Sequence, residues 1–231
     1  MHERILDELE LLPVARLYGL AEAPARPGAS PQVGPVAGIE AMDWAQLREA
    51  VRTCRRCRLC GQRKQAVFGV GNESAPWLLV GEGPGAEEDE RGEPFVGQAG
   101  KLLDAMLAAL RLARGREAYI ANVVKCRPPG NRVPQADEAD ACAPFLDRQI
   151  DLIAPKLIVA LGKTAATRLT GAEGSLAGQR GRVHRYRGIP VVVTYHPAYL
   201  LRNLPDKAKA WEDLLFARRV MASGAVPDAA S

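Results

Sequence analysis

Three polar residues stand at or near the predicted ends of buried strands. Glu82 follows the apolar run WLLVG, Asn122 lies near the end of the run AYIANVV, and His196 follows VVVTY. In a parallel sheet covered by helices, ligands bind at the carboxyl ends of the strands. There a carboxylate can orient water, an amide can read a polar ligand edge, and an imidazole can stabilise a developing negative charge. The three residues therefore form a candidate catalytic site.

The first of these strands runs into a glycine-rich loop, GEGPG, at residues 81–85. The loop lacks the Gly-Lys-Ser/Thr ending of a phosphate-binding Walker loop. It fits the looser dinucleotide pattern through Gly81, Gly83 and Ala86. Carboxylates around it would repel a pyrophosphate, however, and the next predicted helix begins only at residue 100, so a dinucleotide site is not favoured.

The carboxylates of this region differ in their settings. Glu82 lies between two glycines, where the backbone can approach a ligand closely, so we expect its side chain to point into the cleft. Residues 87–90 could hold a hard cation or form a solvated acidic turn, and the sequence leaves both open. Phe95 precedes the next predicted helix, either as a core aromatic or as a flat surface on which a flipped base stacks.

The five cysteines are an odd number, and three of them crowd into seven residues. Metal ligation is the better expectation than disulfides in a reducing compartment. A zinc ribbon would normally offer a second close pair of cysteines, whereas ligation by thiolates alone also suits an iron–sulfur cluster. The spacing does not show which cysteine is spare among Cys54, Cys57, Cys60, Cys126 and Cys142. Arginines and lysines around them form either a phosphate-binding surface or an ordinary solvated face.

Short apolar runs alternate with helical patterns, which predicts an α/β fold with a parallel sheet under helices on both faces. Buried strands are expected over 77–80, 118–126 and 156–162, with a hairpin over 182–197. Helices are expected over 43–51, 100–113, 137–154, 163–169 and 206–221.

The chain of 231 residues, with 47% apolar residues and a net charge of +4, suits one domain of ordinary size. We assign residues 1–42 to an N-terminal helix and a flexible Pro/Gly-rich linker, 43–221 to the domain, and 222–231 to a disordered tail. No apolar run is long enough to cross a bilayer, and the N-terminus lacks the layout of a secretory signal. We therefore expect a cytoplasmic protein.

Four ordered motifs resemble the family 4 uracil-DNA glycosylases, the iron–sulfur type. They are GEGPGAEED, GEPFVGQAG, NVVKCRPPGNRVP and HPAYLLRN, together with the cysteines in the expected order. The resemblance runs from about Cys54 to about Leu215. It implies a three-layer α/β/α sandwich around a short, mostly parallel central sheet, and a monofunctional enzyme of base excision repair that hydrolyses the N-glycosidic bond of uracil and leaves an abasic site.

The resemblance also implies a [4Fe–4S] cluster with a structural role, held by Cys54, Cys57, Cys126 and Cys142, which leaves Cys60 spare. UdgX-type relatives carry GEQPG in the first motif and a basic insertion with a reactive histidine, and this chain has neither. Family 5 enzymes lack the carboxylate in the first motif. The resemblance therefore favours ordinary excision from family 4.

Carried onto this sequence, the family's catalytic residues are Glu82, which orients the attacking water, and His196, which donates to uracil O2. Asn122 pairs with the uracil edge, Phe95 stacks on the ring, and the backbone at Gly83 helps to hold the base. Cytosine presents the reversed hydrogen-bonding pattern to Asn122, so a fixed amide discriminates between the two bases.

A base inside a duplex must be flipped out to reach such a site. One of Leu200 and Leu201 is expected to fill the vacated stack, with Arg202 on phosphate. We expect a monomer that acts on uracil-containing DNA, single- or double-stranded. Two rival interpretations remain: a non-catalytic iron–sulfur module that binds DNA, and a zinc-bound nucleotide hydrolase.

Overall fold

A computed structural model of the chain describes residues 38–223. The helix predicted over 1–15, nearly all of the predicted linker and most of the predicted tail lie outside these residues. Within them, no helix is both long and apolar enough to cross a membrane.

The centre of the fold is a six-stranded sheet of order β1-β3-β2-β4-β6-β5. The four inner strands run parallel, and the two edge strands pair antiparallel with their neighbours. Every residue of β2, β3 and β4 is buried, as expected for parallel strands that are covered on both faces. The strands are β1 (Val70–Gly71), β2 (Trp77–Gly81), β3 (Ala118–Asn122), β4 (Leu157–Leu161), β5 (His184–Tyr186) and β6 (Ile189–Thr194).

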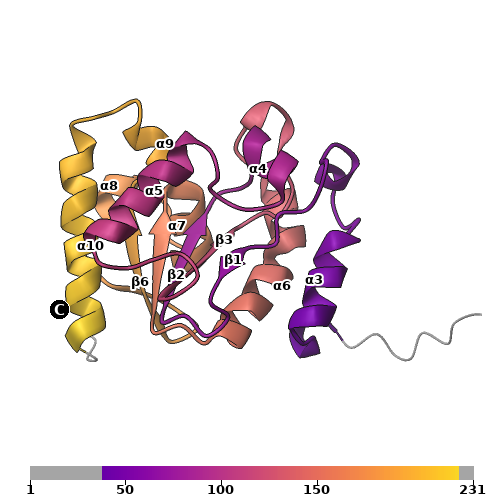
Figure 1. Ribbon diagram of the computed structural model, residues 1–231, viewed down its shortest axis with the longest axis horizontal. Helices are drawn as coiled ribbons and strands as arrows, with labels where there is room; N and C mark the ends of the chain where they lie inside the picture. Colours follow the sequence, from indigo (N-terminus) through magenta and orange to yellow (C-terminus); the bar gives the residue numbers. More distant parts are fainter. Residues whose placement is uncertain (1–37, 224–231) are drawn as a thin grey trace, which may run out of the picture. The chain divides into compact units, whose positions relative to one another are not determined.

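Two layers of helices cover the sheet (Figure 1). One core cluster packs α3, α6 and α7 against one face, and a second packs α5 and α10 against the other. The predicted α/β/α sandwich with a mostly parallel sheet is therefore confirmed. The helices are α3 (Trp44–Arg52), α4 (Ala86–Arg91), α5 (Gln98–Ala109), α6 (Ala136–Ile153), α7 (Lys163–Thr170), α8 (Leu176–Gln179), α9 (Pro197–Leu200) and α10 (Asp206–Ser223), with 3-10 turns η1 (Ile39–Ala41), η2 (Arg58–Gly61) and η3 (Pro129–Asn131).

The domain begins earlier than predicted. Residues 39–42 were assigned to the N-terminal segment, but Ile39–Ala41 forms η1 and Met42 is buried in the core. The carbonyl oxygen of Met42 accepts a hydrogen bond from Arg148 Nε at 2.6 Å. An apolar side chain at 39 and another at 42 are enough to fix this turn against α6.

The sheet order brings three strand ends together. From β2 the chain crosses to β3 on one side, and β4 then pairs on the other side of β2. Gly81 pairs with Asn122, and Leu161 pairs with Thr194, two residues before His196. The strand order therefore reverses at β2, with β3 on one side of it and β4 on the other. Such a reversal opens a crevice at the carboxyl edge of the sheet, where α/β proteins bind ligands.

Candidate active site

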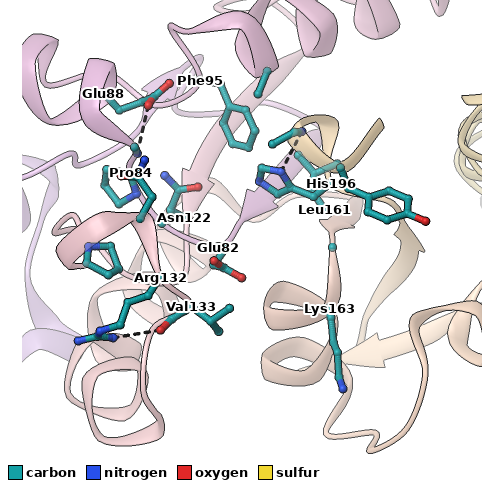
Figure 2. A pocket seen from close by; sticks show the side chains of 18 of the residues that line it. Glu82, Pro84, Glu88, Phe95, Asn122, Arg132, Val133, Leu161, Lys163 and His196 are labelled. Carbon is teal, nitrogen blue, oxygen red and sulfur yellow. Dashed lines mark hydrogen bonds between the residues drawn. The ribbon is translucent and has the colours of Figure 1, made fainter. Parts of the chain in front are cut away.

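A cavity of about 470 Å³ lies at this carboxyl edge. Glu82, Asn122 and His196 all line it, so the three strand-end residues do share one site. Phe95 and Gly83 line it as well. In Figure 2 the side chains of Glu82, Phe95, Asn122 and His196 surround the same space, although they come from four different segments.

Asn122 is the last residue of β3 and is only 2% exposed. Its Oδ1 is buried and has no hydrogen-bond partner within the protein. A buried amide oxygen without a partner is costly, so a donor on a ligand would be bound strongly there. Gly81 makes room for this amide, because a Cβ at position 81 would lie 2.5 Å from Asn122 Oδ1 and 2.6 Å from Phe95 Cζ.

A buried lysine, Lys125, holds the backbone carbonyl group of Asn122. Lys125 Nζ donates to the Asn122 carbonyl oxygen at 2.9 Å and to Gln149 Oε1 at 2.5 Å. Gln149 in turn donates to the carbonyl oxygen of Phe68 at 2.9 Å. The end of β3 is therefore fixed by side chains of the interior.

His196 is the N-cap residue of α9, and its ring orientation is fixed by the backbone. Its Nδ1 accepts a hydrogen bond from the Ala198 N–H at 3.1 Å. The proton of the neutral ring must then sit on Nε2, which makes Nε2 a donor. Burial above all, together with the charge of Arg202, lowers the pKa of His196 to about 4, although Glu88 acts in the opposite direction. The ring is therefore neutral at physiological pH.

Phe95 packs beside this histidine. The two rings stack with centroids 5.4 Å apart and an interplanar angle of 30°. Phe95 has a positive φ of 54°, which is rare for a bulky residue and places its ring toward the strand ends. Pattern analysis could not predict this conformation.

Glu82 is half-buried beside the pocket. Thr164 Oγ1, in the first turn of α7, donates a hydrogen bond to Glu82 Oε2. This contact leaves the other carboxylate oxygen for a ligand or water. Thr164 was missed by the sequence analysis, although it follows β4 closely and the strand-end rule could have found it.

The acidic run after the glycine loop proves to be a structural element. Residues 86–91 form helix α4, where a solvated turn or a metal site was predicted. Glu88 accepts hydrogen bonds from the backbone N–H groups of Gly85, Val96 and Gly97. Asp89 is buried and accepts from the Lys64 N–H at 3.0 Å. Acidic residues in a first helical turn are favoured by the helix dipole, which explains their clustering.

The turn of Gly83 to Gly85 was expected to offer backbone donors to a base or phosphate. The Gly85 N–H is already used by Glu88 at 3.1 Å. Gly83 lines the pocket, and a Cβ there would lie 2.7 Å from Val124 Cγ2. Close packing is therefore one physical reason for glycine at position 83.

The segment after His196 separates the two leucines that the sequence analysis treated together. Leu200 is 1% exposed and belongs to a core cluster with Tyr195 and Ala210, so its predicted contact with DNA is wrong. Leu201 is 41% exposed, and Arg202 is exposed and lines the pocket. The helical turn of α9 directs the first leucine inward and releases the second.

Among the pocket-lining residues that were not predicted as site residues are Arg132, Val133 and Lys163. Val133 is 61% exposed at the pocket rim. Arg132 donates to Glu138 Oε1 at 2.6 Å and Oε2 at 2.8 Å, and Arg58 Nε also donates to Oε1 at 2.8 Å. The two guanidinium groups, Arg132 above all, lower the pKa of buried Glu138 to about 2. Glu138 thereby ties the rim loop to the cysteine segment that contains Arg58.

The five cysteines line one small apolar cavity on the α6 side of the sheet. Three N–H groups point at sulfur: Arg63 Nη1 lies 2.8 Å from Cys126 Sγ, the Lys125 N–H 3.3 Å from Cys142 Sγ, and the Arg56 N–H 3.5 Å from Cys54 Sγ. Such donors stabilise thiolates that bind iron, so the chemistry of the cavity fits a cluster.

Across residues 38–223, no group of three or more His, Cys, Asp or Glu side chains is placed to hold a single metal ion. In a four-iron cluster each thiolate binds a different iron atom, so the thiolates need not converge on one point.

Comparison with known proteins shows the family to which the chain belongs. A family model of the uracil DNA glycosylase superfamily matches residues 68–215, and the chain belongs to this superfamily. Within it the chain is similar to type-4 uracil-DNA glycosylases. It is 42% identical to that of Pyrobaculum aerophilum over 181 residues, which is 75% of this chain and 92% of the relative. It is 46% identical to that of Thermotoga maritima over 165 residues, which is 71% of this chain and 85% of the relative.

A type-5 uracil-DNA glycosylase of Pyrobaculum aerophilum is more distant, at 30% identity over 173 residues, 68% of this chain and 76% of the relative. The resemblance to family 4 that the motifs predicted is therefore confirmed, as is the preference for family 4 over family 5.

Proposed function

We propose that this protein removes uracil from DNA by hydrolysis of the N-glycosidic bond, in the pocket at the carboxyl edge of the sheet. The observation that carries the proposal is the buried, unpartnered Asn122 Oδ1, which shares a pocket with the Nε2 donor of His196 and the ring of Phe95. The superfamily match and the type-4 relatives support the same activity.

Recognition of uracil follows from the Asn122 amide. Its free oxygen accepts from uracil N3–H, and its amino group donates to O4. Cytosine has an acceptor at N3 and a donor at N4. It would therefore place an acceptor against the Asn122 oxygen and a donor against the Asn122 amino group. Lys125 fixes the backbone at Asn122, which sets where the amide stands at the end of β3.

Bond cleavage leaves positive charge on the sugar and negative charge on the departing base. The Nε2–H of His196 donates to uracil O2 as that oxygen gains charge, and a neutral donor suffices in a dry pocket. Glu82 opposes the sugar cation and orients the water that adds to C1′. The products are free uracil and an abasic site, and the water supplies the oxygen and the protons.

DNA enters from the exposed rim. Leu201 is placed to occupy the stack that the flipped nucleotide leaves, and Arg202 beside it binds phosphate. Arg132 and Val133 also line the pocket. We propose that the protein acts on single- and double-stranded DNA as a monomer.

The cysteine cavity would hold a [4Fe–4S] cluster through Cys54, Cys57, Cys126 and Cys142. The cluster supplies structural cross-links between the segment before η2, the loop after β3 and helix α6. Glu138 joins the first two of these at a second point, and the rim residue Arg132 depends on it. The cluster thus supports the DNA-facing rim and takes no part in bond cleavage.

A direct test is release of uracil from single- and double-stranded oligonucleotides that contain one uracil. The full-length protein should release free uracil and leave an abasic site in both. An oligonucleotide with cytosine at the same position is the control and should stay intact. A protein that binds these oligonucleotides but releases no base would instead be a non-catalytic DNA-binding module.

Selectivity should depend on the amide of Asn122. In Asn122→Asp the side chain can no longer donate to uracil O4, and a carboxylate near the departing anion is unfavourable. We expect single-turnover uracil release to fall by roughly 10²-fold and the preference for uracil over cytosine to shrink. Asn72→Asp, at an exposed position after β1 that is absent from the pocket lining, is the matched control. Unchanged discrimination in Asn122→Asp would contradict the assignment.

The cysteines should differ in their importance. Cys142→Ser removes a proposed ligand from helix α6, and the purified protein should lose its iron and its brown colour. Cys60→Ser changes a cysteine of the same cavity that is not a proposed ligand, so it should keep both. Elemental analysis for iron and zinc measures the outcome. Loss of iron in Cys60→Ser with retention in Cys142→Ser would reverse the ligand assignment.

A further inference from the structure

The backbone of the loop that carries Phe95 is strained. This loop contains neither of the proposed catalytic residues, Glu82 and His196. Phe95 has φ of 54°, a strained conformation that bulky side chains rarely adopt. Its side chain is nevertheless buried and stacked on His196. Strain of this kind persists only where neighbouring groups hold the residue in place.

Arg114 supplies one part of that restraint. It lies between α5 and β3 and is absent from the pocket lining. Its Nη1 donates to the Pro94 carbonyl oxygen at 2.7 Å, and its Nη2 donates to the Phe95 carbonyl oxygen at 2.8 Å. Asp104 on α5 holds the same guanidinium, with Oδ1 3.0 Å from Nη2 and 3.2 Å from Nε.

Two other contacts also hold the backbone around Phe95 in place. Gly100 in α5 has no side chain, and a Cβ there would overlap the Phe95 carbonyl oxygen. On the far side of Phe95, Glu88 accepts from the N–H groups of Val96 and Gly97. The peptide groups on both sides of the strained residue are therefore fixed, which leaves the ring in one orientation.

We propose that Arg114 is a positioning residue that sets the base-stacking surface, by holding the Phe95 carbonyl against helix α5. The planar guanidinium is suited to this role because it offers two donors in fixed directions to consecutive carbonyl groups, which a lysine ammonium does not. Arg114 touches neither the base nor the DNA. The inference rests on the proposed function, since the base that stacks on Phe95 is the extruded uracil.

The test uses Arg114→Ala and Arg114→Lys in the full-length protein, with Arg116→Ala as the matched control. Arg116 has an exposed side chain and pairs only with Glu117, at 3.4 Å, among the ion pairs of residues 38–223. Four quantities are measured: the inhibition constant of free uracil, kcat and KM on a uracil-containing oligonucleotide, and the Kd for an oligonucleotide with a stable abasic analogue.

Arg114→Ala should raise the inhibition constant of free uracil and lower kcat/KM by roughly tenfold each, because a stacked base contributes about that factor. Binding of the abasic oligonucleotide should change less than about twofold, since no base is present to stack. Arg114→Lys should show a smaller effect in the same direction, and Arg116→Ala should match the wild type. A merely structural role would move abasic binding together with uracil inhibition.

A second variant keeps the test decisive if Arg114→Ala does not fold. Asp104→Asn leaves Arg114 in place but weakens its anchor, and it should raise the uracil inhibition constant with little change in Tm. Wild-type uracil inhibition in both Arg114→Lys and Asp104→Asn would overturn the inference. The role of Arg114 is tested by the ratio of each variant's uracil inhibition constant to that of the wild type. The proposed function is tested separately, because a wild-type protein that releases no uracil would contradict it.

Discussion

Replacement of His196 by alanine should slow single-turnover uracil release by roughly 10²- to 10³-fold, the usual cost of losing one donor to a developing oxyanion. The ring Nε2–H is the donor that the backbone contact of Nδ1 leaves facing the pocket. Binding to uracil-containing DNA should weaken far less, because phosphate contacts dominate the affinity. Rapid-quench kinetics beside a binding titration would separate the two quantities.

The matched control for this variant is His184→Ala. His184 lies on the edge strand β5 and contacts the Gln179 carbonyl oxygen at 2.7 Å through Nε2. It is absent from the pocket lining, so its loss should leave the cleavage rate unchanged. If His196→Ala lost DNA binding and kept the rate of bond cleavage, the role given to the imidazole would be wrong.

The pH dependence of stability offers an independent check that His196 is neutral. Its pKa is about 4 in the folded protein, below the ordinary 6.5. As the pH falls below about 6.5, the unfolded chain takes up a proton that the folded protein refuses, so the free energy of unfolding declines until about pH 4. His196→Ala should remove this component of the decline, and denaturant titrations at several pH values would measure it.

Replacement of Glu82 by alanine should also be severe, with a loss of roughly 10²- to 10⁴-fold in the rate of excision. The carboxylate both orients water and opposes the charge on the sugar. Glu82→Gln keeps the shape but loses the charge, so it should recover only part of the rate. The comparison is made under single-turnover conditions on a single-stranded oligonucleotide, where base flipping is easiest.

Glu90→Gln is the control for Glu82. Glu90 belongs to the same acidic run but is exposed and pairs with Lys64, away from the pocket lining. Its loss should leave excision unchanged. Equal rates in Glu82→Ala and Glu90→Gln would show that the water is activated by another group.

Strand ends were the most predictable part of the site. Glu82, Asn122 and His196 were placed correctly because buried parallel strands read as short apolar runs and all end at the same edge of the sheet. The helices of the two outer layers were predicted with small errors at their ends. Their apolar periodicity is strong, and it fixes which face meets the sheet.

Features that depend on tertiary contacts were not predictable. Leu200 and Leu201 are adjacent residues of the same type, so the sequence alone does not distinguish them. The turn of α9 buries Leu200 in the core and leaves Leu201 exposed. The acidic run looked like a solvated turn or a cation site, yet Glu88 accepts hydrogen bonds from the backbone N–H groups of Gly85, Val96 and Gly97. The Gly85 cap and the glycine at 92, with φ of 78°, were the local signals of helix α4.

The cysteine site could be predicted only in part. Their chemistry and number indicated metal ligation, and the fold brings all five to one cavity from three separate segments, at residues 54–60, 126 and 142. Spacing alone could not identify the spare cysteine, because Cys54, Cys57 and Cys60 follow one another at equal intervals.

A crystal structure of the protein soaked with free uracil tests the central claim most directly. The account predicts the base between the strand ends, stacked on Phe95, with N3 within hydrogen-bond distance of Asn122 Oδ1 and O2 within that distance of His196 Nε2. Uracil bound elsewhere, or bound in this pocket with its N3 edge turned away from Asn122, would contradict it.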